Sequence, residues 1–300
     1  MGDCTGNSCL SSLEDDLPVF PWWLAALGVG VLGILGYWLF DVTEGAYLGS
    51  RVVALLYDWS ASRYDDIKGF DHEDESWFLA QPLLNRLAAV PQPLILDVAT
   101  GTARLPRALF RESHFQGRIV ALDLSQRMLE QAARETESRA RHILFLHQDA
   151  TALPFPEATF DAVACLEALE FLPHARRTLQ EMVRVLRPGG VLLTTNRRGW
   201  QARLFWGRAL ARSQVIALLQ ETGLEGVTVQ SWQVIYDLVW ARRSGDLLRG
   251  RFPASELSSL VQCPQCHSAT LHYEAAALCC PHCGVVYPLR GRIASLSKAT

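Results

Sequence analysis

The feature that most constrains this chain of 300 residues is an uncharged apolar run near its start. No Asp, Glu, Lys or Arg lies between Asp16 and Asp41, and Val19–Phe40 reads VFPWWLAALGVGVLGILGYWLF. As a helix this run spans roughly 33 Å, which matches a hydrocarbon core about 30 Å thick. Aromatic rings that prefer the membrane interface stand at its two ends: Trp22, Trp23, Tyr37 and Trp38. We therefore expect one transmembrane helix over residues 19–40, with a buried core helix as the alternative.

The charges on either side of this run predict its orientation. Residues 1–50 hold six carboxylates and no Lys or Arg, and the first positive charges that follow are Arg51, Arg63 and Lys68. Positive charge is retained on the cytoplasmic side, so we expect the acidic tail 1–18 outside and residues 41–300 in the cytoplasm. Cysteines in that reducing compartment should be thiols or metal ligands. A net charge of −3 argues against a nucleic-acid partner.

From about residue 50 the pattern alternates between short apolar runs and amphipathic segments. We expect strands at 94–99, 118–125, 142–150, 160–169 and 191–196, and a strand hairpin within 227–243. Helices are expected at 105–113, 126–138, 175–186 and 213–223. A turn at Arg187-Pro188-Gly189-Gly190 should close the third of these helices. Such alternation is typical of an α/β fold with a doubly wound, mostly parallel sheet. Ligands of these sheets bind at the carboxyl ends of the strands.

Two acidic residues mark those strand ends. Asp97 ends the first strand and leads into the small-residue turn Ala99-Thr100-Gly101-Thr102-Ala103, where a ligand can lie against the backbone. Asp123 follows Gly101 by 22 residues, a spacing that suits recognition of a ribose diol. Arg104 stands where the third glycine of a dinucleotide fingerprint would be, so a nicotinamide cofactor is disfavoured.

Four segments in this order resemble the motifs of class I S-adenosylmethionine (SAM) methyltransferases. They are LILDVATGTARLPRAL, IVALDLSQRMLEQA, HQDATALPFPEATFDAV and MVRVLRPGGVLLTTN. The quinone-biosynthesis C-methyltransferases are the most similar group, and YDWSASRYDDI (57–67) looks like their N-terminal cap. The resemblance implies a seven-stranded Rossmann-like methyltransferase sheet within a domain that we place at residues 45–243.

The same resemblance assigns candidate SAM ligands. Asp97 and the turn residues Ala99, Thr100, Gly101 and Thr102 would approach the methionine part, and Asp123 with Leu124 the ribose. Asp149 and Ala150 would flank the adenine, with Met128 packing on its face. Ala103 departs from the family, which usually has glycine there.

Candidates for the methyl-acceptor side are less sharply defined. Glu167 follows the fourth strand and is our candidate general base or acceptor-binding group, with a structural carboxylate paired to an arginine as the alternative. The basic and aromatic stretch GWQARLFWGRALAR (199–212) reads as an amphipathic helix. It would lie either on an anionic membrane surface or as a lid over the acceptor pocket.

The C-terminal segment carries two C-x2-C pairs, Cys263/Cys266 and Cys280/Cys283. Four thiolates at this spacing predict a closed, structural zinc site. The spacing favours Cys280 over its neighbour Cys279, because only Cys280 gives C-x2-C. The segment 255–296 resembles the small zinc-ribbon activator subunit of RNA and protein methyltransferases, and residues 244–254 read as a linker. We expect the ribbon and the methyltransferase domain to have separate cores. The resemblance implies a protein partner for the ribbon.

Together these features predict a membrane-anchored, SAM-dependent methyltransferase with a structural zinc ribbon. The anchor and the aromatic stretch favour a small lipophilic acceptor such as a quinone or lipid precursor. Two alternatives remain open: a methyltransferase of protein or RNA, and a SAM-binding scaffold whose ribbon recruits a partner.

Overall fold

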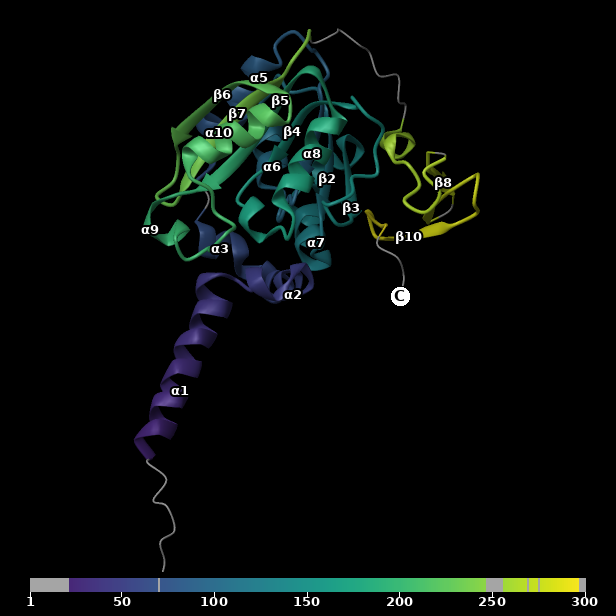
Figure 1. Ribbon diagram of the computed structural model, residues 1–300. Coiled ribbons are helices and arrows are strands. Elements are labelled where there is room, and N and C mark those ends of the chain that lie inside the picture. The colour runs from purple at the N-terminus through teal and green to yellow at the C-terminus, as the bar shows by residue number, and fades with distance from the viewer. Residues whose placement is uncertain (1–21, 70, 247–255, 269, 275, 297–300) are drawn as a thin grey trace, which may run out of the picture.

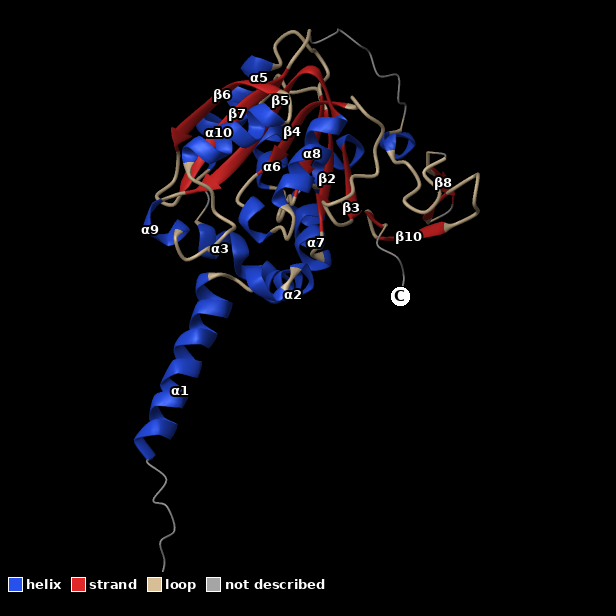
Figure 2. Cartoon of the chain, viewed as in Figure 1, coloured by secondary structure: helices blue, strands red, loops and turns tan. Residues whose placement is uncertain are grey.

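A computed structural model describes residues 22–69, 71–246, 256–268, 270–274 and 276–296 of the chain (Figure 1). The expected tail 1–18, the first three residues of the expected membrane helix and most of the expected linker 244–254 lie outside these ranges. Figure 2 shows a central sheet flanked by helices, with one long helix projecting from its base.

The central sheet has seven strands in the order β6-β7-β5-β4-β1-β2-β3. The strands are β1 (Leu94–Val98), β2 (Arg118–Asp123), β3 (Ile143–His147), β4 (Phe160–Cys165), β5 (Leu186–Arg197), β6 (Leu224–Ser231) and β7 (Tyr236–Arg243). The first five run parallel to one another, and β7 is antiparallel to both β5 and β6. This confirms the predicted doubly wound, mostly parallel fold.

Alternate residues of the strands face two apolar cores. Along β1, Leu94, Leu96 and Val98 pack on one side with helices α8 (Ala175–Val185) and α10 (Arg212–Glu221). Ile95 faces the other side, which α5 (Gln81–Arg86), α6 (Arg104–Arg111) and α7 (Gln126–Glu135) cover. All five residues of β1 are buried, because a parallel strand covered on both faces exposes neither.

Two local predictions are wrong. The segment Arg187-Pro188-Gly189-Gly190 was expected to be a turn, yet it lies inside β5, where Arg187 forms a buried ion pair with Asp161 (2.5 Å). The expected amphipathic helix at 199–212 is reduced to α9 (Gly199–Ala202). Gly207 has a φ of +69°, which lies outside the helical region, so the segment turns instead of continuing as a helix.

The N-terminal helix stands apart from the sheet. Helix α1 (Trp22–Tyr37) continues through a π-helical turn, Trp38–Val42, to give a 21-residue apolar helix long enough to cross a membrane. None of its most apolar window is buried within the described structure, which argues against the alternative of a core helix. A short turn then leads into α2 (Ser50–Ser60), which lies across the base of the domain (Figure 1).

The C-terminal ribbon extends the central sheet. Its strands are β8 (His272–Glu274), β9 (Ala277–Cys279), β10 (Val286–Arg290) and β11 (Ile293–Ser295), and β11 pairs parallel with β3. Leu257, Leu278 and Leu296 belong to the same apolar core as the methyltransferase strands. The expectation that the ribbon has a separate core is therefore wrong, because an open edge strand offers its backbone groups to any neighbouring strand.

Candidate functional site

The carboxyl end of β1 carries a buried acid. Asp97 is 3% exposed, and the Thr100 hydroxyl donates a hydrogen bond of 2.6 Å to its Oδ2. Burial raises the pKa of Asp97 to about 7; the Thr100 hydrogen bond opposes this rise, and the nearby Asp123 carboxylate adds to it. A strand-end carboxylic acid with such a pKa is an expected partner for a ligand that brings positive charge.

The turn after Asp97 is folded tightly against the end of the sheet. Ala99, Gly101 and Ala103 have positive φ angles of 55°, 55° and 63°. Ala103 therefore takes the left-handed conformation that glycine favours, and it is fully buried at the start of α6. Strained backbone of this kind is concentrated at functional sites. The methyltransferase family usually has glycine at the position of Ala103, and the alanine of this chain does not prevent the tight turn.

Asp123 connects the ends of β1 and β2. Its Oδ2 accepts a hydrogen bond from the Gly101 amide (2.8 Å), and its Oδ1 accepts one from the Ser125 amide (2.8 Å). Burial raises the pKa of Asp123, and these backbone donors oppose the rise. Each carboxylate oxygen has a second lone pair, so Asp123 can also accept hydrogen bonds from a diol.

Two adjoining pockets lie at these strand ends. The larger, with about 770 Å³ of empty space that includes its open mouth, reaches Asp123, Leu124, Asp149 and Ala150. The smaller contains Asp97, Thr100 and Thr102, and Ala99 and Gly101 line both. Nine of the ten predicted cofactor residues therefore line a pocket. Met128 does not: it is fully buried and lines neither pocket, so the structure does not place it against a ligand there.

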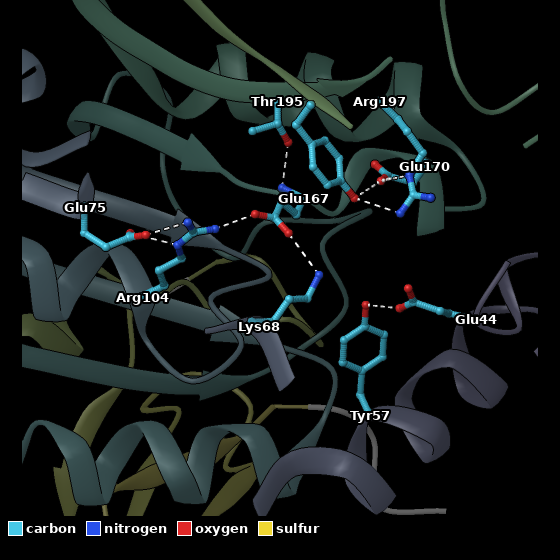
Figure 3. Close-up of polar contacts among 10 residues, drawn as sticks. Glu44, Tyr57, Lys68, Glu75, Arg104, Glu167, Glu170, Thr195 and Arg197 are labelled. Carbon is cyan, nitrogen blue, oxygen red and sulfur yellow. Dashed lines mark hydrogen bonds and ion pairs between the residues drawn. The ribbon is translucent and has the colours of Figure 1, made fainter. Parts of the chain in front are cut away.

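Glu167 lies where the two pockets meet, but its carboxylate is already engaged. Figure 3 shows Oε2 paired with the Lys68 ammonium (3.1 Å) and Oε1 with the Arg104 guanidinium. Arg104 also donates to Glu75, with 2.8 Å between Nε and Oε2. A carboxylate held by two cations is poorly suited to accept a proton, so the structural alternative for Glu167 is the one that these contacts favour.

The backbone of Glu167 is also constrained. Its φ is +51°, and its amide donates to the Thr195 hydroxyl oxygen (2.6 Å). This hydrogen bond fixes the loop after β4 to β5, which places the Glu167 side chain toward Lys68 and Arg104 (Figure 3). Glu167 thereby joins helix α3 (Tyr64–Lys68) to the cofactor-side turn.

One wall of the larger pocket is apolar and aromatic. Val53, Ala54 and Tyr57 of α2 line it together with Phe171 and Leu172. The Tyr57 hydroxyl donates to Glu44 Oε2 (2.6 Å; Figure 3). Burial, with a smaller contribution from Glu44, raises the pKa of Tyr57 well above its ordinary value, so this phenol is a hydrogen-bond donor and not a base.

A second polar cluster is buried beside the pocket. Glu170 pairs with Arg197 (3.1 Å) and accepts from the Tyr236 hydroxyl (2.5 Å). Burial raises the pKa of Glu170, and Arg197 opposes the rise. The cluster lies next to the pocket lining, because the Arg197 guanidinium is 6.0 Å from the ring centroid of Phe171.

Sequence reasoning did not identify Tyr57, Lys68 or Arg104 as site residues. Each contacts a residue far away in the chain; Lys68, for example, precedes Glu167 by 99 positions. The available signal was the resemblance of residues 57–67 to a methyltransferase cap, which located Tyr57 but neither Lys68 nor Arg104.

The four predicted zinc ligands converge in the ribbon. Four sulfur atoms all lie within 4.8 Å of one another, those of Cys263, Cys266, Cys280 and Cys283. Cys279 is not in this group. The Cys263–Cys283 and Cys266–Cys280 sulfur distances are 3.7 and 3.6 Å. Tetrahedral zinc with bonds of about 2.3 Å requires sulfur atoms about 3.8 Å apart. The cluster therefore fits a tetrahedral metal ion, and zinc suits an all-thiolate set.

Comparisons with known proteins agree with this arrangement. Residues 96–194 match the family described as "Methyltransferase domain". Demethylmenaquinone methyltransferase of Clavibacter sepedonicus is 35% identical over 140 residues, which cover 46% of this chain and 55% of that protein. The ubiquinone/menaquinone biosynthesis C-methyltransferase UbiE of Bordetella parapertussis is 32% identical over 144 residues, 48% of this chain and 56% of that protein. The chain thus spans little more than half the length of these relatives.

A solved structure shares the fold. The [4+2]-cyclase SpnF superposes with a TM-score of 0.55 at 19% identity, covering 66% of this chain and 97% of that one. At this identity the likeness shows the fold alone, and one fold can carry different reactions. The family match, the strand order and the strand-end pockets agree: the segment 96–194 is a methyltransferase domain of the SAM-dependent class I type.

Proposed function

We propose that this chain is a membrane-anchored, SAM-dependent methyltransferase that acts on a small lipophilic acceptor, a quinone or lipid precursor. The anchor is residues 19–40, the catalytic unit is 45–243, and the ribbon 255–296 holds structural zinc through its four thiolates. The observation that carries the proposal is the larger pocket, because it combines predicted SAM ligands on one side with an apolar, aromatic wall on the other.

Across the two adjoining pockets Asp97, the turn residues 99–102 and Asp123 would bind SAM, and Val53, Tyr57 and Phe171 of the larger pocket would contact the acceptor. Methyl transfer from a sulfonium requires chiefly that the donor and acceptor atoms be aligned. In a transfer to carbon, the new C–C bond forms as the S–CH3 bond breaks, and the acceptor carbon then loses a proton. Since Glu167 is held by two cations, its role in the proposal is to position the loop and α3 and not to take that proton.

The quinone class is supported by the two relatives, whose names place them in quinone biosynthesis. We propose that residues 1–18 lie outside and that the catalytic unit is cytoplasmic, because Arg51, Arg63 and Lys68 follow the span. Protease added to intact spheroplasts should remove an N-terminal tag and spare a C-terminal one. The opposite cleavage pattern would contradict this topology.

The function is tested with the full chain in nanodiscs, isotopically labelled SAM and a demethylated quinol as acceptor. We expect an acceptor product that carries one labelled methyl group. Asp123→Asn is the matched control, since it keeps the side-chain shape and removes the charge. SAM binding without any labelled product would favour the alternative of a SAM-binding scaffold. Labelled protein or RNA in a cell extract would favour the alternative of a protein or RNA methyltransferase.

A further inference from the structure

Helix α2 presents an exposed stripe that the catalytic site does not use. Arg51, Leu55 and Trp59 follow one another at intervals of four residues and therefore share one face of the helix. Leu55 is 66% exposed and Trp59 is 84% exposed. A large aliphatic and a large aromatic side chain left in water beside an arginine are typical of a helix that lies on a membrane surface.

The opposite face of the same helix closes the larger pocket. Val53, Ala54 and Tyr57 of α2 line that pocket. Ser125 Oγ also donates to Asp58 Oδ1 (2.5 Å), so α2 is fixed to the loop that follows Asp123. Helix α2 therefore separates the pocket, on one face, from the exposed stripe of Arg51, Leu55 and Trp59, on the other.

The turn between α1 and α2 holds the stripe close to the end of the membrane helix. Thr43 and Gly45 donate backbone hydrogen bonds to the carbonyls of Trp38 (3.0 Å) and Leu39 (2.8 Å), so the turn continues directly from α1. The Tyr47 ring stacks on Trp38 with centroids 5.0 Å apart.

The same turn is attached to the catalytic unit. The Tyr47 hydroxyl donates to the Trp206 carbonyl (2.9 Å). The Arg208 guanidinium lies 5.1 Å from the Tyr47 ring centroid. Trp206 itself is 84% exposed, which adds a second large aromatic side chain beside this turn. These contacts fix the catalytic unit to the end of α1, so α2 cannot be far from the membrane that α1 spans.

We propose that α2 lies in the interfacial layer of that membrane, with Leu55 and Trp59 inserted among the lipids, and that the lipophilic acceptor reaches the pocket from the lipid phase beside α2. The occupant of the stripe is the bilayer, since only seven residues, 43–49, separate α2 from the π-helical turn that extends α1 and Figure 1 shows α2 at the base of the domain from which α1 projects. Arg51 is placed to meet anionic headgroups. The route of the acceptor rests on the proposed methyl transfer, whereas the placement of α2 rests only on the proposed membrane anchor.

The placement is tested by fluorescence quenching with the full chain in nanodiscs. The lipids carry bromine either near the headgroup end or near the terminal end of the acyl chain. In the wild-type chain we expect bromine to quench the emission of Trp59, and shallow bromine to quench it more than deep bromine. Trp59→Phe should therefore reduce the fraction of the tryptophan emission that bromine quenches, and the reduction should be larger for shallow bromine. Trp77→Phe is the matched control, because Trp77 is 73% exposed but leads into α5, at the end of the domain opposite α1 (Figure 1).

Equal quenching differences for Trp59→Phe and Trp77→Phe would overturn the placement. The placement would also be overturned if bromine did not quench the Trp59 emission. In that case a second copy of the chain or another protein would cover the stripe.

The route is tested with the double variant Leu55→Glu, Trp59→Glu, neither of which lines the pocket. We expect methylation of a long-chain acceptor embedded in the nanodisc to fall about tenfold or more. SAM affinity and methylation of a short-chain, water-soluble analogue should be unchanged. An equal fall for both acceptors would refute the route. If the wild-type chain methylates neither acceptor, the proposed function and the route fail together, while the quenching result still decides the placement.

Discussion

The raised pKa of Asp97 predicts that SAM binding releases a proton. In the free protein the pKa of Asp97 is about 7, against an ordinary value of 3.8, and burial is the main cause. A bound SAM brings an ammonium group and a sulfonium, and by the methyltransferase resemblance its methionine part lies next to Asp97. Nearby positive charge favours the carboxylate and returns the pKa toward its ordinary range.

The magnitude follows from the two pKa values. At pH 6 a group with a pKa near 7 is about nine-tenths protonated, and at pH 8 about one-tenth. We therefore expect SAM binding to release about 0.9 proton from Asp97 at pH 6 and about 0.1 at pH 8. Calorimetric titrations in two buffers with different ionisation enthalpies measure this number directly.

Asp97→Asn is the variant that isolates the contribution. Its amide oxygen can still accept the Thr100 hydrogen bond, but it cannot release a proton. Asp123 also has a raised pKa, so a residual release can remain in the variant. If Asp97→Asn releases as many protons at pH 6 as the wild type, the assignment of Asp97 to the cationic part of the ligand is refuted.

The same pKa shift has a consequence for stability without ligand. The unfolded chain loses the Asp97 proton near pH 3.8 and the folded chain near pH 7, so between these values the folded state binds more protons. Stability should therefore fall as pH rises through this window, by up to about 4 kcal/mol at about 1.4 kcal/mol per pH unit. Denaturant unfolding of Asp97→Asn should lack this fall, and at pH 8 the variant should be the more stable protein.

Three further changes test the site and the ribbon. Asp123→Ala should weaken SAM binding by about 1.5–3 kcal/mol, the scale of a hydrogen bond to a charged group, as measured by calorimetry; an unchanged affinity would remove Asp123 from the site. Arg104→Met should destabilise the fold by about 3–5 kcal/mol in denaturant unfolding, because it leaves the buried Glu75 and Glu167 without their shared partner; a loss below about 1 kcal/mol would show that the pairing is dispensable. Cys283→Ser should lower the zinc content well below one per chain by elemental analysis and Cys279→Ser should not; the reverse would show that the ligand register is wrong.

The sequence predicted the fold well because its main signals are local. The apolar run Leu94–Val98 and the acids Asp97 and Asp123 at the strand ends can be recognised from short stretches of sequence. The order of the methyltransferase motifs then predicts the order of the strands along the chain. The errors arose where long-range contacts decide the conformation. Arg187 lies in a strand because Asp161 pairs with it, although Pro188 and Gly189 favour a turn.

The site was predicted less completely for the same reason. The proposed SAM side is built from consecutive residues of single turns, which motifs describe. The proposed acceptor side is built from α2, α3 and the loop after β4, whose packing no local pattern specifies. The role of α2 as a pocket wall, and the engagement of Glu167 by Lys68, became visible only once those segments were placed together.

The pairing of β11 with β3 has a consequence for the synthesis of the protein. Phe145 of β3 has its partner in Ile293, almost 150 positions later in the chain. At about 5–20 residues per second, a ribosome needs roughly 8–30 s to make that intervening segment. During this time the outer edge of the cofactor-binding sheet would be unpaired, and such an edge is a template for association with other chains. A nascent chain would therefore depend on β11 to complete the sheet, and translation that stops before residue 293 should produce an aggregation-prone protein even though every residue of the 96–194 domain has been made.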